Sequence, residues 1–381
     1  MLLFEESILY ILLIHVNFVR MDAVEALRRI AFLLEKANEP TYRVRAFRGA
    51  AKTLDELPPG ELAERVAANR LKDLPGIGDA TAAVIREAMA GAVPTYLARL
   101  EAQAPRESVT VSHGGESIRA LLKGDCHVHS DWSDGGSPIR EMAEAAREQG
   151  HEYMVLTDHS PRLTVANGLS TERLLRQLDL VAELNRELAP FRILTGIEVD
   201  ILDDGSLDQE PGLLARLDVV VASIHSKLRM EAKAMTQRMV VAIANPHMDI
   251  LGHCTGRLVG GGDESETSGP AQPRNSRDRA HKGKRPESEF DAEMVFAACA
   301  KFDKAVEINS RPERLDPPRR LLKLAVEWGC RFSIDTDAHA PGQLAWLPNG
   351  CARAQECGVD PARVVNTMGV EGLLEWTGSH C

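Results

Sequence analysis

The feature that most constrains this chain is a series of short apolar runs, each ending in side chains that can bind a metal ion. The first run spans residues 124–129 and contains His127 and His129. In an extended strand, side chains two residues apart point to the same side, so these two imidazoles can converge on one cation. Five later runs end in similar side chains. The candidate metal ligands are His127, His129, Asp134, His159, Glu198, His225, His253, Asp337 and His339.

Each of these histidines, taken alone, is more often a satisfied core residue than a ligand. The repetition argues for a different interpretation, because a barrel of parallel strands gathers residues at the C-terminal ends of its strands. Helical patterns alternate with the runs, over residues 139–149, 171–188, 232–244 and 319–328. Such alternation is typical of a parallel sheet surrounded by helices. We therefore predict an α/β barrel that carries a metal site.

The order of the motifs resembles the PHP (polymerase and histidinol phosphatase) family of metal-dependent phosphoesterases. The motifs are HxH with a following SDG, then TDH, GIE, SIH, GH and TDAH, and they cover about residues 120–378. The resemblance implies a distorted β/α barrel of seven strands around a trinuclear metal site, with all nine ligand positions filled. It also implies that Glu198 is the bridging ligand. Residues 307–310 and 314–316 resemble the pattern of the family as well.

The candidate ligands are imidazoles and carboxylates without thiolates, which suits two to three divalent ions of Zn²⁺, Mn²⁺ or Fe²⁺. Such ions activate water and bind phosphoryl oxygens, so the expected reaction is hydrolysis of a phosphate ester. We expect Asp158 to orient a histidine from outside the ligand set. The predicted catalytic residues are Glu198, Asp337, His159 and Arg314. The predicted phosphate contacts are Lys227, Arg229, Asn309 and Arg314, and the alternative for the three cationic side chains is an ordinary surface position.

Residues 21–103 form a helical region that contains a predicted helix-hairpin-helix at residues 74–85. Gly76, Ile77 and Gly78 form its turn, and backbone amides at such a helix start are suited to a DNA phosphate. The alternative is a turn that serves only as scaffold. A basic cluster lies on an earlier helix, either as further DNA contacts or as a solvated face. Its members are Arg43, Arg45, Arg48 and Lys52.

A helix-hairpin-helix followed by a PHP-like barrel resembles the bacterial family X DNA polymerases with their polymerase region removed. The linker at residues 104–120 leaves no room for that region and carries only the isolated carboxylates of Glu107 and Glu116. We therefore expect no DNA synthesis. Ala80 and Val84 occupy the positions of the lyase lysines in that family, and neither can form a Schiff base. We therefore expect no deoxyribose-phosphate lyase activity.

The length of 381 residues fits a barrel of roughly 250 residues together with one helical module. The predicted domains are the helix-hairpin-helix domain at residues 21–103, the linker at 104–120 and the phosphoesterase domain at 121–381. A polar segment at about residues 260–286 is predicted to be a disordered insertion. Residues 1–20 are predicted to be an extension ahead of a start at Met21, since their apolar run is too short to span a bilayer and lacks a signal-peptide pattern.

The net charge of −11 argues against capture of DNA by the whole surface, so any DNA contact must be local. Seven cysteines without a CxxC pair indicate reduced thiols and a cytoplasmic protein that does not enter a membrane.

Two functions fit the features of the sequence. One is a DNA 3′-end phosphoesterase, either a 3′-5′ exonuclease or a 3′-phosphatase in DNA repair. The other is a small-molecule phosphatase of the histidinol-phosphate type. A non-enzymatic support for a binding module is a third reading, disfavoured by the complete ligand set.

Overall fold

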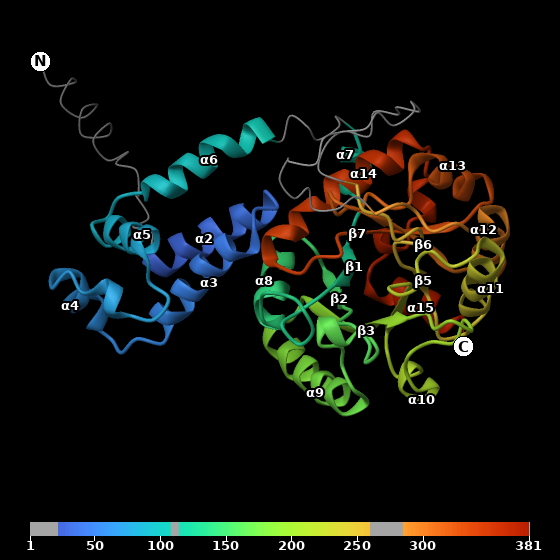
Figure 1. Cartoon of the computed structure of the whole chain (residues 1–381), viewed down its shortest axis with the longest axis horizontal. Helices are drawn as coiled ribbons and strands as arrows, with labels where there is room; N and C mark the ends of the chain where they lie inside the picture. Colours follow the sequence, from blue (N-terminus) through green and yellow to red (C-terminus); the bar gives the residue numbers. More distant parts are fainter. Residues whose placement is uncertain (1–21, 108–113, 260–284, 381) are drawn as a thin grey trace, which may run out of the picture. The chain divides into compact units, whose positions relative to one another are not determined.

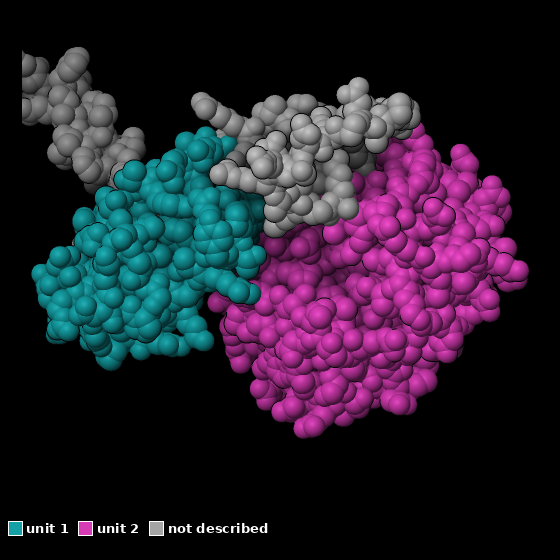
Figure 2. Space-filling view, viewed as in Figure 1, with its two compact units in different colours: residues 1–108 teal, residues 109–381 magenta. Residues whose placement is uncertain are grey.

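The chain divides into two units with separate hydrophobic cores, residues 1–108 and 109–381 (Figures 1 and 2). The computed structural model describes residues 22–107, 114–259 and 285–380. The predicted extension at residues 1–20 and nearly all of the predicted insertion at 260–286 lie outside the described residues. Within the described ranges, no helix combines the length and the apolar character that crossing a membrane requires.

Unit 1 is a helical domain built around α2 (Ala23–Lys36). The apolar face of α2 is buried against α3 (Thr41–Asp55) and α5 (Asp79–Met89), which confirms the prediction that this region is helical. Glu35 of α2 accepts two hydrogen bonds of 2.8 Å from the guanidinium of Arg48 in α3. The remaining helices are α4 (Glu61–Ala67), the 3-10 helix η1 (Leu71–Asp73) and α6 (Thr95–Glu107).

Seven parallel strands form the centre of unit 2 and pair in chain order from β1 to β7 (Figure 1). Residues 219–221 are three consecutive buried valines, as expected for a strand covered on both faces. This arrangement confirms the predicted seven-stranded barrel. The strands are β1 (Gly124–Val128), β2 (Tyr153–Leu156), β3 (Arg192–Asp200), β4 (Val219–Ser223), β5 (Ile250–Leu251), β6 (Ala305–Asn309) and β7 (Arg331–Asp335).

Helices connect the strands and cover the outside of the sheet (Figure 1). The helix α8 (Ile139–Glu148) buries Ile139, Met142, Ala143 and Ala146, the spacing of one helical face. Three further helices end within one residue of their predicted bounds: α9 (Thr171–Leu188), α11 (Ala232–Ile243) and α13 (Arg319–Glu327). The others are α10 (Pro211–Leu214), α12 (Ala292–Lys301), α14 (Leu347–Glu356), α15 (Val370–Gly378) and the 3-10 helices η3 (Thr164–Ala166), η4 (Pro341–Trp346), η5 (Pro361–Arg363) and η6 (Val365–Thr367).

The segment predicted as a linker, residues 104–120, is helical at both of its described ends. The helix α6 continues to Glu107, and α7 (Glu116–Arg119) belongs to unit 2. Ile118 of α7 is buried in the core of the barrel, and the Gly115 amide donates to Gln355 Oε1 at 2.7 Å. Burial of this apolar side chain explains why the second part of the segment is ordered against the barrel.

The two end strands of the sheet are joined by side chains and by an isolated bridge between Val128 and Ala338 instead of a full ladder. The Cys126 amide of β1 donates to Asp335 Oδ1 of β7 at 2.8 Å, and the His129 amide donates to Ala338 O at 2.8 Å. The buried side chain of Asn366 donates to Gly124 O at 3.0 Å and to Ile334 O at 2.7 Å. It also accepts from the Ile334 amide at 3.1 Å. Asn366 therefore links β1 to β7 and nearly closes the barrel.

Replacing Asn366 by alanine should lower the free energy of unfolding of unit 2 by about 3 kcal/mol, because buried backbone groups on both strands lose their partner. Urea denaturation followed by tryptophan fluorescence measures this loss, since all four tryptophans lie in unit 2. Asn349→Ala is the matched control. The Asn349 side chain makes one bond of 3.1 Å, to Ser310 O, so about 1 kcal/mol should be lost. Equal losses in the two variants would contradict the assigned role of Asn366.

Candidate metal centre

The predicted ligands gather at the C-terminal ends of the parallel strands. His127 lies within β1 and Glu198 within β3, and the other side chains follow a strand directly or through a short loop. This placement explains how residues far apart in the sequence reach one region. His159 follows β2, His225 follows β4, His253 follows β5, Asp337 and His339 follow β7, and His129 and Asp134 follow β1.

Glu198 lies at the centre of the group and is buried. Its Oε2 atom is 2.8 Å from His159 Nδ1, and its Oε1 atom is 2.9 Å from His253 Nε2. Three further imidazole nitrogens surround the same carboxylate. His127 Nε2 and His129 Nε2 lie 3.4 and 3.6 Å from Oε2, and His225 Nε2 lies 3.3 Å from Oε1. One carboxylate therefore faces five histidines, the position expected for a ligand shared between cations.

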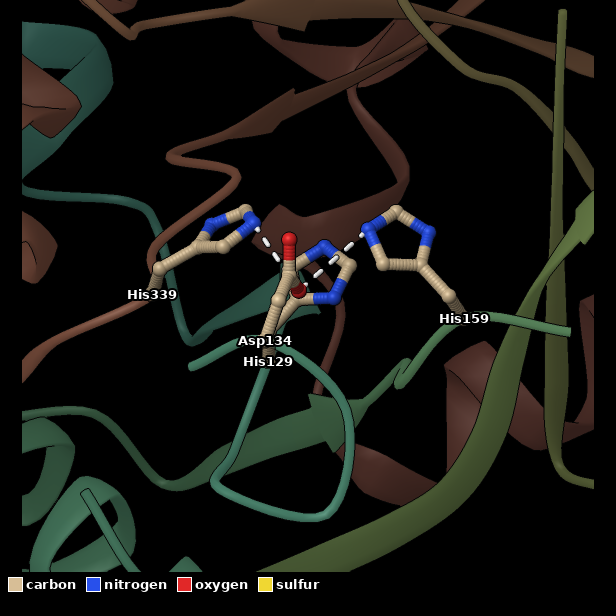
Figure 3. Close-up of side chains that lie close together, drawn as sticks. All are labelled: His129, Asp134, His159 and His339. Carbon is tan, nitrogen blue, oxygen red and sulfur yellow. Dashed lines mark ion pairs between the residues drawn. The ribbon is translucent and has the colours of Figure 1, made fainter. Parts of the chain in front are cut away.

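Asp134 forms a second, more open group with His129, His159 and His339 (Figure 3). Asp134 Oδ1 is 3.5 Å from His159 Nε2 and 3.4 Å from His339 Nε2. The Asp134 side chain is 36% exposed, more than any other predicted ligand, so this group marks the mouth of the cluster. His159 belongs to both groups, with Nδ1 toward Glu198 and Nε2 toward Asp134.

Asp337 occupies the side of the cluster next to β7. Its Oδ1 atom is 3.4 Å from His129 Nε2, and its Oδ2 atom is 3.0 Å from the Nε atom of Arg314. Its backbone has φ of +54°, a left-handed conformation that side chains other than glycine adopt with strain. Such conformations often occur where a functional side chain must be aimed.

The donor atoms in the cluster fit a bound cation. Buried polar groups normally have hydrogen-bond partners, whereas within the described residues several atoms facing Glu198 have none. Some of the imidazole nitrogens among them lie close to a carboxylate oxygen, but their orientation does not form a hydrogen bond. Imidazole nitrogens and carboxylate oxygens without thiolates are ligands of Zn²⁺, Mn²⁺ or Fe²⁺. The unpaired atoms are His127 Nε2, His129 Nδ1 and Nε2, His159 Nδ1, Glu198 Oε1 and Oε2, His225 Nε2, and His253 Nδ1 and Nε2.

Two buried carboxylates orient these imidazoles from outside the cluster. Glu307 Oε1 is 2.6 Å from His127 Nδ1, and Asp200 Oδ1 is 2.5 Å from His225 Nδ1. Each contact leaves Nε2 of the histidine directed at Glu198, the arrangement common for histidines that bind metals. Neither carboxylate is among the site residues predicted from the sequence. Asp200 could have been predicted from the sequence, since it lies two residues after Glu198 in the same strand and therefore points to the same side.

The electrostatics of the cluster favour added positive charge. Burial alone would raise the pKa of Glu198, but His225, His127 and His159 hold it well below its ordinary value. Burial lowers the pKa of His225, yet Glu198 and Asp200 outweigh this effect and raise it to about 9. His129, buried beside His339 and His159, has its pKa lowered to about 3. A divalent cation would supply the positive charge that protonated histidines supply otherwise.

Asp158 does not orient a histidine, which corrects the sequence prediction. Its carboxylate accepts from the Ser130 amide at 2.8 Å, from Ser133 Oγ at 2.5 Å and from Gln177 Nε2 at 2.7 Å. These contacts fix residues 130–133, which precede Asp134. Asp158 therefore positions the loop that carries Asp134, because its side chain turns toward that loop and away from the neighbouring His159.

Two of the predicted phosphate contacts lie elsewhere. The Lys227 side chain is 61% exposed and forms an ion pair with Asp203, and Arg229 is exposed. Among the contacts of the described residues, none joins either side chain to a predicted ligand. The backbone of Lys227 is left-handed (φ +52°), and its side chain is directed at Asp203 instead of at the cluster.

Arg314 and Asn309 do reach the cluster. Arg314 is 14% exposed and its Nε and Nη1 atoms have no hydrogen-bond acceptor within the described residues, although Nε lies near Asp337. Asn309 Nδ2 lies 3.3 Å from both Glu307 Oε2 and Asp337 Oδ2. Asn309 therefore holds two carboxylates, while Arg314 keeps donors available for an anionic group.

The predicted DNA contacts of unit 1 are only partly available. Arg48 is paired with Glu35, and Arg43 contacts Glu39 at 2.5 Å and Tyr96 Oη at 2.7 Å. Both guanidiniums are therefore engaged within unit 1, whereas the sequence offered all four cations as DNA contacts or as a solvated face. Arg45 and Lys52 are exposed and lie seven residues apart, on one face of α3.

The predicted hairpin turn forms, with Gly76 in a left-handed conformation (φ +75°). The Ile77 amide donates to Leu74 O at 3.3 Å and the Gly78 amide donates to Thr81 Oγ1 at 2.9 Å, so neither is free for a phosphate, contrary to the prediction. Within the described part of the chain, the Gly76 amide has no acceptor. Thr53 Oγ1 of α3 donates to Pro75 O at 3.0 Å, which places the end of α3 beside this turn.

Several known proteins are similar to a large part of this chain. The "DNA polymerase/3'-5' exonuclease PolX" of Bacillus subtilis is 38% identical over 252 residues, which cover 66% of this chain and 40% of that protein. The chain therefore matches less than half of that relative's length. A "probable phosphatase" of Thermoanaerobacter is 27% identical over 254 residues, covering 64% of this chain and 89% of that protein.

Among solved structures, a histidinol phosphate phosphatase from Lactococcus lactis, complexed with zinc, L-histidinol and phosphate, aligns with a TM-score of 0.41 and 18% identity. The alignment covers 63% of this chain and 95% of that one.

Domain families match two separate segments of the chain. Residues 20–92 match the helix-hairpin-helix domain family, and residues 125–310 match the PHP domain family. The chain therefore carries a helix-hairpin-helix domain followed by a PHP domain.

Proposed function

We propose that the protein is a metal-dependent phosphoesterase that hydrolyses phosphate esters at DNA 3′ ends, without DNA synthesis. The observation that carries this proposal is the meeting of all nine predicted ligands in one cluster centred on Glu198, in a chain that also contains a helix-hairpin-helix domain. The ligand cluster supplies the chemistry of ester hydrolysis, and the helix-hairpin-helix domain supplies a means of holding DNA. The PolX relative, whose name includes a 3′-5′ exonuclease, supports the choice of DNA ends.

The cluster would hold two or three divalent ions. Glu198 with His127, His225 and His253 forms the buried part, and Asp134 with His159 and His339 forms the part at the mouth. When bound, divalent ions supply Lewis-acid centres that activate water and offset charge on phosphoryl oxygens. Glu307 and Asp200 keep the imidazoles aimed at Glu198.

Arg314 would bind the phosphoryl group from the side of Asp337. Burial lowers its pKa, but Asp337 and Glu198 outweigh this effect, so the guanidinium stays charged. Its Nη1 donor is buried without an acceptor among the described side chains and backbone groups, and a phosphoryl oxygen would satisfy it. Hydrogen bonds between a guanidinium and a phosphate are among the stronger ones in proteins.

DNA would be held by one face of unit 1. Arg45 and Lys52 provide exposed positive charge on α3, and the Gly76 amide provides a donor at the neighbouring hairpin turn. Contacts of this kind bind the DNA backbone without reading its sequence. They also explain how a chain with a net charge of −11 binds a polyanion, since the binding is local.

A phosphatase acting on a small phosphate ester is the second candidate. The Thermoanaerobacter phosphatase aligns over 89% of its length, so the barrel alone resembles a complete phosphatase. In that case the helix-hairpin-helix domain has no part in the reaction. The two candidates differ in one measurable property, the contribution of unit 1 to turnover of DNA.

The substitution Glu307→Gln should weaken binding of Zn²⁺ or Mn²⁺ about 10- to 100-fold, because the neutral amide no longer raises the basicity of His127. Competition with a chromogenic chelator measures this affinity. Glu152→Gln removes a carboxylate that pairs with Lys123 at the surface and should leave the affinity unchanged. An unchanged affinity in Glu307→Gln would show that this carboxylate does not tune the cluster.

The double charge reversal Arg45→Glu and Lys52→Glu should reduce turnover of 3′-phosphorylated nicked DNA about 10-fold or more, because two phosphate contacts become repulsive. The logarithmic salt dependence of DNA affinity should become shallower by roughly 2. Hydrolysis of p-nitrophenyl phosphate should not change, since that substrate has no DNA backbone.

The control is Arg186→Glu with Lys233→Glu, two exposed positions on α9 and α11 of unit 2 that give the same change in net charge. Wild-type activity on DNA in the α3 variant would remove unit 1 from the reaction. Efficient hydrolysis of histidinol phosphate by a protein inactive on DNA would establish the second candidate instead.

A further inference from the structure

Arg311 lies beside the cluster, although it is not among the site residues predicted from the sequence. It begins the turn after β6, in which the amides of Arg314 and Leu315 donate to Arg311 O at 2.9 and 3.0 Å. This turn directs two guanidiniums at the same carboxylate. Arg314 Nε is 3.0 Å from Asp337 Oδ2, and Arg311 Nη1 is 3.8 Å from Asp337 Oδ1.

The contacts of the Arg311 side chain are long. Its Nε atom is 3.4 Å from Glu313 Oε2, and its Nη1 atom is 3.5 Å from Asp337 O and 3.3 Å from His339 Nδ1. N–H···O hydrogen bonds in proteins are usually about 2.7–3.2 Å. A guanidinium has five donors, so Arg311 retains hydrogen-bonding capacity that these contacts do not use.

Arg311 also lies next to the mouth of the cluster. It contacts His339 through Nδ1, and the other ring nitrogen of His339 is 3.4 Å from Asp134 (Figure 3). The Arg311 side chain is 23% exposed, compared with 14% for Arg314. Its guanidinium carbon lies 6.0 Å from the centroid of the Trp346 ring, which restricts the positions that the side chain adopts.

We infer that Arg311 binds the phosphoryl oxygens of the substrate at the mouth of the cluster, beside the more buried Arg314. This inference rests on the proposed hydrolysis of phosphate esters at the cluster. The planar guanidinium fits two oxygens of a phosphoryl group, which a lysine ammonium does not match. Two arginines on one turn then contact the phosphoryl group from a buried and an exposed side.

The test uses the full chain loaded with Mn²⁺ and the variant Arg311→Gln. Isothermal titration calorimetry with inorganic phosphate should show a dissociation constant about 10- to 100-fold higher than in the wild type, the loss typical of a charged hydrogen bond. The KM for p-nitrophenyl phosphate should rise by a similar factor. Mn²⁺ content should stay at the wild-type level, and Arg311→Lys should lie between the wild type and Arg311→Gln.

Arg331→Gln is the matched control. Arg331 lies at the opposite end of β7, is 26% exposed, and contacts Asp303 at 2.7 Å, so its loss should leave phosphate binding unchanged. Wild-type phosphate affinity in Arg311→Gln would overturn the inference. So would a loss of Mn²⁺ equal to the loss of phosphate affinity, because Arg311 would then act through Asp337. An inactive wild type that still binds phosphate through Arg311 would refute the proposed hydrolysis and leave the inference standing.

Discussion

The cluster of candidate metal ligands is organised around one buried carboxylate, that of Glu198, which faces five histidines. Its oxygens and the facing nitrogens lack hydrogen-bond partners within the described residues. Each unsatisfied buried polar group costs about 1–3 kcal/mol, so the group together would cost on the order of 10 kcal/mol, comparable to the whole stability of a domain. Bound cations or water must satisfy these atoms. The fold therefore places these energetically unfavourable buried polar groups together at the site where the proposed metal binding requires them.

The near closure of the sheet assembles this arrangement. His127 and His129 come from the first strand, and Asp337 and His339 follow the last. They meet because β1 and β7 are joined by Asn366 and by the bond from the Cys126 amide to Asp335. The same contacts that stabilise the barrel therefore bring the first and last ligands together. Asp158 performs a similar role for the loop that carries Asp134.

The barrel, and the side chains that meet at its strand ends, were predictable from sequence because their signals are local. A buried parallel strand is a short apolar run, and a candidate ligand at its C-terminal end is the polar residue that stops the run. The side chains that orient or neutralise others carry no such signal. Glu307 contacts His127 across 180 residues, and Arg48 pairs with Glu35 on a different helix. Lys227 follows His225 closely in sequence but points to Asp203. The partners of these side chains depend on tertiary contacts. The basic cluster in the sequence therefore predicted more available positive charge on α3 than the structure has.

The central claim is that the side chains around Glu198 hold divalent cations. An anomalous-diffraction experiment on crystals of the full chain grown with Mn²⁺ or Zn²⁺, measured on both sides of the absorption edge of the metal, tests this claim most directly. The account predicts two or three anomalous peaks, with at least one next to Glu198 and one next to Asp134. A map without a peak among these nine side chains, in crystals shown to contain the metal, would contradict it.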